Sequence, residues 1–185
     1  MSGKRLRPIL IALSAIGIAG SAFAQDAPRR VVVEDVPSLK NIYRVSASKT
    51  HSGYPVPRFV SLKYGKVNGR QGPSTQHPIL WQYRRKGLPL VVVAEMDIWR
   101  KVRDHNGDES WVRTQALSGV RTVMVKEDIK LFHKADAYSK VNAIASKDAL
   151  LKLVECPDNG WCRVRSDDGL KGWVERRYLW GAEAL

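Results

Sequence analysis

Residues 99–119 read WRKVRDHNGDESWVRTQALSG, and residues 161–181 read WCRVRSDDGLKGWVERRYLWG. The two stretches align without a gap at a shift of 62 residues and share eight identities in 21 positions, where chance would give about one or two. The shared pattern is W-x2-V-R-x3-G-x3-W-V-x4-L-x-G. An internal repeat with only two units indicates two small domains of the same fold rather than a solenoid.

Short runs of β-branched and aromatic residues surround the repeated stretches and indicate strands, as in residues 59–62 and 88–93 of the first unit. Asn106 and Gly107 lie between two such runs and favour a hairpin turn, because both tolerate a positive φ angle. No window shows a helical period, so the sequence predicts an all-β protein. A unit of about 55 to 60 residues made of short strands buries its core best as a small barrel.

The first residues predict export. Three basic residues precede an apolar run at positions 8–20, and a small-x-small cleavage site ends at Ala24, before Gln25. This arrangement indicates a signal peptide over residues 1–24, cut between Ala24 and Gln25. The alternative is an uncleaved membrane anchor, for which the apolar run is short. We therefore expect no membrane span after cleavage.

The chain is strongly basic. Lys and Arg outnumber Asp and Glu by 31 to 18, a formal net charge of +13. Cleavage removes three basic residues and no acids, which leaves 28 against 18, or +10. This excess favours an anionic partner such as nucleic acid, anionic lipid or a cell-envelope polymer. Export argues against nucleic acid, so we expect no nucleic-acid partner.

The chain after the signal peptide divides into a tail and two domains. Residues 25–57 contain four prolines, scattered charge and a small polar stretch at 46–53, and we expect them to form an extended, disordered tail. The strand-like texture starts at residue 58. We therefore place the first domain at residues 58–122 and the second at residues 123–185.

Cys156 and Cys162 are the only cysteines. An even number of cysteines in an oxidising compartment favours a disulfide, and the pair flanks a Pro-Asp-Asn-Gly turn that would bring two adjacent strands together. The alternatives are two buried free thiols, or a zinc site that would need two further ligands.

Several motifs, in order, resemble those of bacterial SH3 domains. The repeated W-x2-V-R-x3-G-x3-W-V pattern is similar to the end of such a domain, and residues 67–74 (VNGRQGPS) resemble its opening V-N-x-R-x-G-P signature. Residues 77–79 (HPI) and 83–90 (YRRKGLPL) match the strands that follow. The resemblance covers about residues 58–182; one departure is Ser110, where the family has the glycine that Gly172 keeps.

The resemblance implies two tandem SH3-like β-barrels in an exported protein of a Gram-negative bacterium, located in the periplasm or secreted. Bacterial SH3 domains are typically binding or targeting modules attached to cell-wall hydrolases. The tandem form implies no particular ligand or oligomeric state.

Nothing in the sequence marks a catalytic site, so we expect no enzyme activity. The cysteines are predicted to be paired, the four histidines are scattered, and no glycine-rich phosphate loop precedes a helix. Asp167 and Asp168 are interpreted as turn-forming residues. We therefore expect no cofactor and no metal.

Aromatic and basic residues are the candidates for ligand contact. Large aromatics at equivalent strand positions usually fill a core, so we interpret four tryptophans as barrel packing: Trp99, Trp111, Trp161 and Trp173. Strand alternation favours the same inward direction for Ile79, Trp81 and Tyr83. A second basic pair is formed by Arg176 and Arg177. The predicted surface contacts are Tyr178, Trp180, Tyr138, Tyr64, Arg84, Arg85 and Lys86.

Two functions from different classes remain open. The first is a module that recognises peptidoglycan or another polymer of the cell envelope. The second is a periplasmic interaction or scaffold module that binds an extended peptide of another protein. An enzyme or enzyme accessory has the least support.

Overall fold

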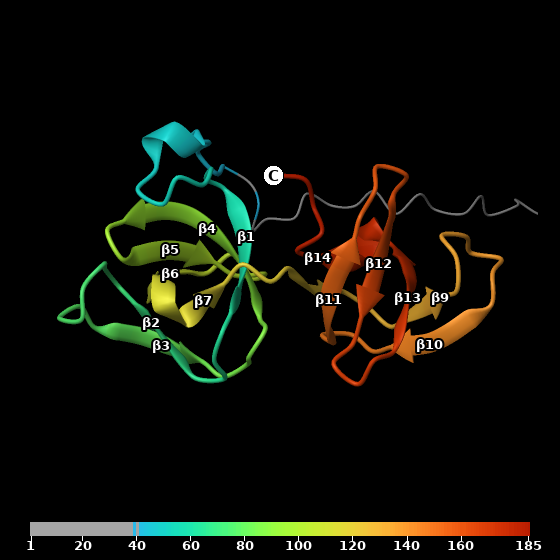
Figure 1. Ribbon diagram of the computed structural model, residues 1–185. Helices are drawn as coiled ribbons and strands as arrows, with labels where there is room; N and C mark the ends of the chain where they lie inside the picture. Colours follow the sequence, from blue (N-terminus) through green and yellow to red (C-terminus); the bar gives the residue numbers. More distant parts are fainter. Residues whose placement is uncertain (1–38, 40) are drawn as a thin grey trace, which may run out of the picture. The chain divides into compact units, whose positions relative to one another are not determined.

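The computed structural model describes residue 39 and residues 41–185, so the predicted signal peptide and its cleavage site at Ala24 and Gln25 lie outside the described residues (Figure 1). The described part is all-β, as predicted, with three short 3-10 turns and no α-helix. It includes no helix that could cross a membrane. Both barrels belong to one compact unit.

Seven antiparallel strands bend into the first barrel, in the order β3-β2-β6-β5-β4-β1-β7 (Figure 1). The 3-10 turn η3 (Thr114–Ala116) precedes the last strand. The strands are β1 (Arg58–Leu62), β2 (Val67–Arg70), β3 (Ile79–Tyr83), β4 (Pro89–Met96), β5 (Trp99–Arg103), β6 (Glu109–Arg113) and β7 (Leu117–Ser118).

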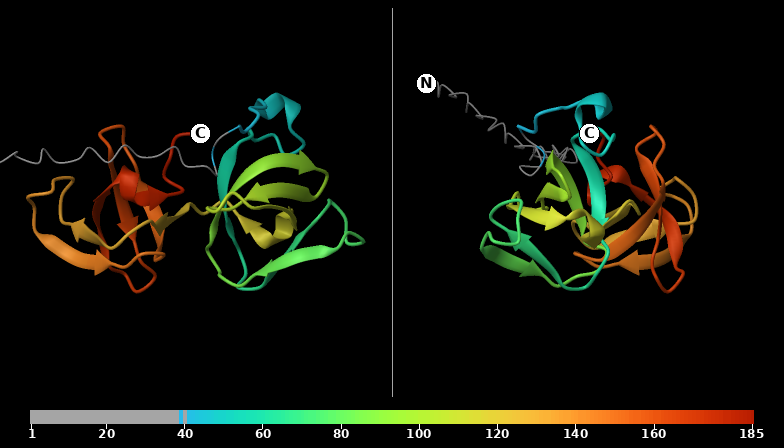
Figure 2. Two further views of the ribbon diagram at one scale, coloured as in Figure 1. Left: turned by 180° about the vertical axis from the view of Figure 1, so that it is seen from behind. Right: turned by 60° about the vertical axis from the view of Figure 1, so that its left-hand side comes forward.

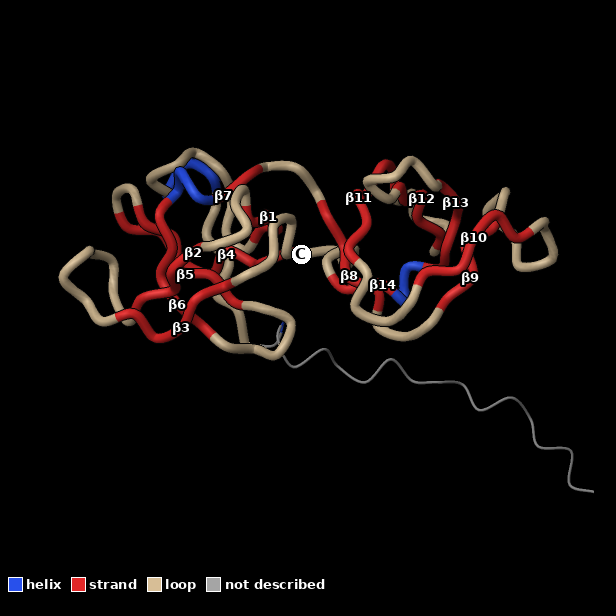
Figure 3. Tube along the Cα trace, turned by 90° about the horizontal axis from the view of Figure 1, so that it is seen from below, coloured by secondary structure: helices blue, strands red, loops and turns tan. Residues whose placement is uncertain are grey.

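The second barrel repeats this topology in the order β10-β9-β13-β12-β11-β8-β14 (Figure 3). The 3-10 turn η4 (Arg176–Tyr178) precedes its last strand. The strands are β8 (Thr122–Val125), β9 (Ile129–Phe132), β10 (Val141–Ala145), β11 (Leu150–Glu155), β12 (Trp161–Arg165), β13 (Lys171–Glu175) and β14 (Leu179–Trp180).

The structure confirms the internal repeat, with the same 62-residue shift in five of the seven strands. Strands β9, β10, β12, β13 and β14 each begin 62 residues after β2, β3, β5, β6 and β7. Gly107 and Gly169 occupy equivalent hairpin turns at φ 95° and 92°, a region that favours glycine. The repeated valines face the two cores: Val102, Val112 and Val164 are fully buried, and Val174 is 2% exposed.

Each barrel is closed where two strands approach very closely, β2 with β6 and β9 with β13. A Cβ added to Gly69 on β2 would lie 2.5 Å from Ser110 Oγ on β6. In the second barrel the glycine is on the other strand: a Cβ added to Gly172 on β13 would lie 2.8 Å from Leu131 Cβ on β9. Gly69 and Leu131 are repeat-equivalent, as are Ser110 and Gly172. The departure at Ser110 is therefore compensated by Gly69.

Part of the predicted disordered tail is in fact structured, and the sequence prediction is wrong for these residues. Residues 45–57, which we call the strap, lie along the first barrel beside β1 and β4 (Figure 2). Val45 and Val56 exchange two backbone hydrogen bonds of 2.8 and 3.0 Å, and Val56 is 3% exposed in the core. The strap includes the 3-10 turn η2 (Ala47–Lys49). Residues 25–38 and 40 lie outside the described residues.

Glu95 on β4 holds the strap. Its carboxylate accepts hydrogen bonds from Ser52 N (2.9 Å) and Ser52 Oγ (2.7 Å) and pairs with Arg58 and Arg100 at 2.5 and 3.2 Å. Burial alone would raise the pKa of Glu95, but the hydrogen bonds from Ser52 and Arg58 and the charge of Arg58 outweigh it, so the pKa is lowered. The local sequence of the strap does not indicate this contact, because the carboxylate that Ser52 binds lies 43 residues away along the chain.

A small apolar cluster joins the two barrels. Phe59 and Val91 of the first barrel pack with Met124 and Trp180 of the second. The rings of Phe59 and Trp180 meet edge to face, with centroids 5.6 Å apart. Arg121 lies over the Phe59 ring at 5.0 Å and donates a 2.8 Å hydrogen bond to Gly181 O. Trp180 is 2% exposed, so the expectation that it lies on the surface is wrong: it is covered by the other barrel.

The closure contact predicts a coupling between Gly69 and Ser110. Gly69→Ala should lower the free energy of unfolding by about 1–3 kcal/mol, because the new methyl group meets a buried side chain. Ser110→Gly removes the opposing atoms, so in a double-mutant cycle measured by urea unfolding the two changes should couple favourably by more than about 0.5 kcal/mol. Gly65→Ala is the control, since its Cβ would meet nothing within 4 Å. Additive effects at Gly69 and Ser110 would contradict the contact.

The lowered pKa of Glu95 predicts a loss of stability in acid. The unfolded chain takes up its proton at a higher pH than the folded chain, so this contribution is complete above the unfolded-state pKa and is lost as the pH falls through the folded-state pKa. The unfolding free energy of the wild type should therefore fall more steeply than that of Glu95→Gln between about pH 5 and pH 2, measured by urea unfolding. Parallel curves for the two proteins would show that Glu95 does not carry the effect.

Candidate functional site

A cavity of about 340 Å³ lies where the two barrels meet. The first barrel contributes the ends of β1 and β7 and the loop between β3 and β4; the second contributes β8, β11 and the turn between β12 and β13. The lining residues are Ser61, Leu62, Lys63, Lys86, Gly87, Ser118, Val120, Thr122, Leu150, Leu151, Lys152 and Asp167.

Hydrogen bonds across the junction fix the walls of this cavity. Thr122 Oγ1 donates to Gly87 O at 2.7 Å, which ties β8 to the loop before β4. Ser61 Oγ donates to Val120 O at 2.8 Å and anchors the linker between the barrels. The hydrogen bonds of these buried hydroxyl groups are made within the protein, so the groups position the walls of the cavity and need no ligand as a partner.

The charged lining is basic, with three lysines and one carboxylate. Lys152 Nζ lies 2.7 Å from Asp167 Oδ1, and the Asp167 side chain is 89% exposed. The hydrogen bond from Lys152 and then its charge lower the pKa of Asp167, with a further contribution from Lys86. Lys63 Nζ lies 5.6 Å from the centroid of the Tyr64 ring.

The structure brings only part of the predicted contact set to this cavity. Of the basic cluster, Lys86 lines it, while Arg84 and Arg85 are exposed and do not line it. Tyr64, 50% exposed, follows the lining residue Lys63. Tyr138 is 98% exposed in the loop between β9 and β10 and does not line the cavity.

Tyr178 and its neighbours belong to another part of the second barrel. Tyr178 packs against the core, and Arg177 lies 4.8 Å from its ring centroid. Arg177 also pairs with Glu175 at 2.8 Å. A second hollow of about 490 Å³ is lined here by both signs of charge: Lys126, Gly160, Glu175, Arg176, Arg177, Glu183 and Ala184.

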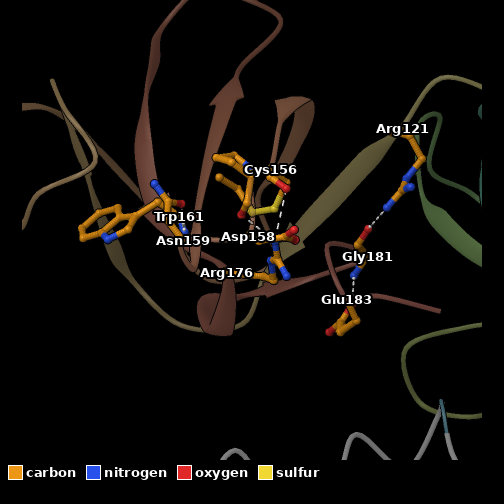
Figure 4. Close-up of a disulfide and its surroundings, with 10 residues drawn as sticks. Arg121, Cys156, Asp158, Asn159, Trp161, Arg176, Gly181 and Glu183 are labelled. Atoms are coloured by element: carbon orange, nitrogen blue, oxygen red, sulfur yellow. Dashed lines mark hydrogen bonds and ion pairs between the residues drawn. A yellow bond between two sulfur atoms is a disulfide. The ribbon is translucent and has the colours of Figure 1, made fainter.

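The disulfide between Cys156 and Cys162 is present, as predicted, and bridges the hairpin of β11 and β12 (Figure 4). Arg176 supports this hairpin: its Nη2 donates to Cys156 O at 3.1 Å and to Pro157 O at 2.7 Å, and it lies 4.0 Å from Asp158 (Figure 4). Arg176 therefore stabilises the hairpin of the second barrel, whereas Arg84 and Arg85 of the first barrel are exposed.

The tryptophan interpretation is only partly correct. Trp99 is 6% exposed, but Trp111, Trp161 and Trp173 are half-buried. On β6 the inward positions are taken by Ser110 and Val112, so the indole between them turns outward. The inward alternation predicted for β3 likewise holds at Tyr83 and is partial at Trp81. It is wrong at Ile79, which is 49% exposed at the start of an edge strand, where the register with β2 shifts.

Sequence reasoning missed Lys63, Lys152 and Asp167 as members of one site. They come from both barrels, and local sequence carries no signal of which loops meet at a domain junction. Asp167 was interpreted as a turn residue, and its backbone does lie in a turn. Among the described residues, no group of three or more His, Cys, Asp or Glu side chains could hold a metal ion.

Comparison with known proteins agrees with this architecture. The family model described as "Bacterial SH3 domain" matches residues 63–119 and 125–181, more than half of the chain. No protein with a curated description matches. Two solved structures from Trichomonas vaginalis are distantly similar: NlpC2 at 9% identity and a TM-score of 0.31, and NlpC1 at 11% and 0.32. The match covers 68% and 73% of this chain but only 48% of each of theirs.

Proposed function

The chain belongs to the bacterial SH3 domain family, and we propose that it is an exported, non-catalytic module that binds peptidoglycan or a related polymer of the cell envelope. One observation carries the proposal: two family domains share a cavity whose charged lining consists of three lysines and one carboxylate. Domains of this family typically bind cell wall, and a positively charged site favours an anionic polymer.

The disulfide and the charge support a location outside the cytoplasm. A disulfide between Cys156 and Cys162 persists in an oxidising compartment and is rare in the cytosol. The basic excess of the whole chain, 31 against 18, matches the negative charge of envelope polymers. Together with the signal peptide predicted over residues 1–24, these features favour the periplasm or the exterior of a Gram-negative bacterium.

A second candidate is the binding of an extended peptide from another protein. Strands β3 and β10 are edge strands in their sheets, and both carry exposed apolar side chains: Ile79, Leu80, Val141 and Ile144. A peptide can add to such an edge through backbone hydrogen bonds. This surface does not involve the basic cavity, so the two candidates are separable by experiment.

We predict that the purified protein without its signal peptide, residues 25–185, sediments with peptidoglycan sacculi. Adsorption by charge alone weakens as salt screens it, so binding at low salt should persist at about 0.15 M salt if the cavity recognises the wall. Neutral cellulose is the control solid. Ile144→Lys, which blocks strand addition at β10, should leave sedimentation unchanged.

Absence of sedimentation at both salt concentrations would contradict the proposed function. Sedimentation lost only in Ile144→Lys would instead favour the edge strand as the contact surface.

A further inference from the structure

We propose that the cavity between the barrels is an anion site: Lys63, Lys86 and Lys152 bind a carboxylate or phosphate group of the polymer while its apolar part packs on Val120 and Leu150. This inference deepens the proposed function and rests on it. It names the group that is recognised and requires residues of both barrels at once.

The lining of the cavity has an excess of positive charge. Three lysines and one carboxylate line the cavity, which leaves two positive charges in excess. In the described part of the chain, neither Lys63 nor Lys86 forms an ion pair with a carboxylate. An anion bound in a lining with excess positive charge is attracted by that charge and gains charge-assisted hydrogen bonds.

Asp167 pairs with Lys152 in the way that we expect the anion of a ligand to do. Its contact with Lys152 is made by a side chain that is 89% exposed. Exposed ion pairs of this kind contribute little stability, about 0 to 1 kcal/mol. A ligand carboxylate or phosphate can therefore replace Asp167 on Lys152 at little cost and add Lys63 and Lys86 as further partners.

The cavity is large enough for a small ligand group and has fixed walls. Its volume of about 340 Å³ is at the lower end of the sizes found for small-molecule sites. Val120, which is 53% exposed, and the half-buried Leu150 supply apolar wall beside the lysines. The bond from Thr122 Oγ1 to Gly87 O and the packing of Trp180 on Phe59 hold the two halves in place, so little ordering is needed on binding.

The test uses backbone NMR titrations of residues 25–185 with three probes. N-acetylmuramyl dipeptide carries one carboxylate, its C-terminal amide carries none, and sodium phosphate supplies the other anionic group. We expect the free acid or phosphate to shift the amide signals of Lys63, Gly87 and Lys152, and the amide probe to leave them unchanged. Which of the two anions acts identifies the source of the group.

Matched variants separate the cavity from general surface charge. The double variant Lys86→Gln, Lys152→Gln should raise the Kd of the active probe at least about tenfold. Arg84→Gln, Arg85→Gln removes the same charge from the two residues before Lys86, which do not line the cavity, and should change the Kd less than about twofold. Asp167→Asn removes the competing carboxylate and should lower the Kd about two- to fivefold. Spectra without probe establish that each variant is folded.

The outcomes distinguish this site from the proposed function. If the wild type sediments with sacculi but neither anion shifts the cavity signals, the anion site is overturned and wall binding stands. Equal losses of affinity in the lysine and arginine variants would also overturn the site, because they would reflect surface charge alone. Binding of an anion at the cavity without sedimentation would support the site and contradict the polymer as its ligand.

Discussion

The close approach of two strands in each barrel is the constraint on which the structure depends. Seven short strands can bury a core only if β2 meets β6 and β9 meets β13, and at each crossing there is no room for two full side chains. The first barrel places its glycine at Gly69 and the second at Gly172. In the first barrel Gly69 opposes Ser110, and in the second Leu131 opposes Gly172, so each crossing has one glycine. This explains how Ser110 can replace a glycine without opening the barrel.

The junction between the barrels uses a position at which the two units differ. Trp180 is equivalent to Ser118 of the first unit, and the larger side chain is the one that packs on Phe59 of the other barrel. The junction in turn brings the loop containing Lys86 to the strand containing Lys152. The proposed anion site, which neither barrel has alone, thus depends on a contact that the two units do not share.

The fold was predictable because its signals are local or periodic: the repeat, the strand runs, the glycine turns and the paired cysteines all agree with the structure. The strap was not, since Ser52 finds its partner at Glu95 on a strand of the barrel. Trp180 was assigned to the surface because no sequence pattern shows which side chains a neighbouring domain covers. For the same reason Lys86 was recognised as basic surface, but its meeting with Lys63 and Lys152 was not.

A crystal structure of residues 25–185 with N-acetylmuramyl dipeptide tests the central claim most directly, because it shows which surface of the tandem barrels receives the ligand. We expect ligand density in the cavity between the barrels, with the carboxylate within hydrogen-bond distance of Lys86 and Lys152 and Asp167 turned away. Density along the edge strands β3 or β10, with the cavity unchanged, would contradict it.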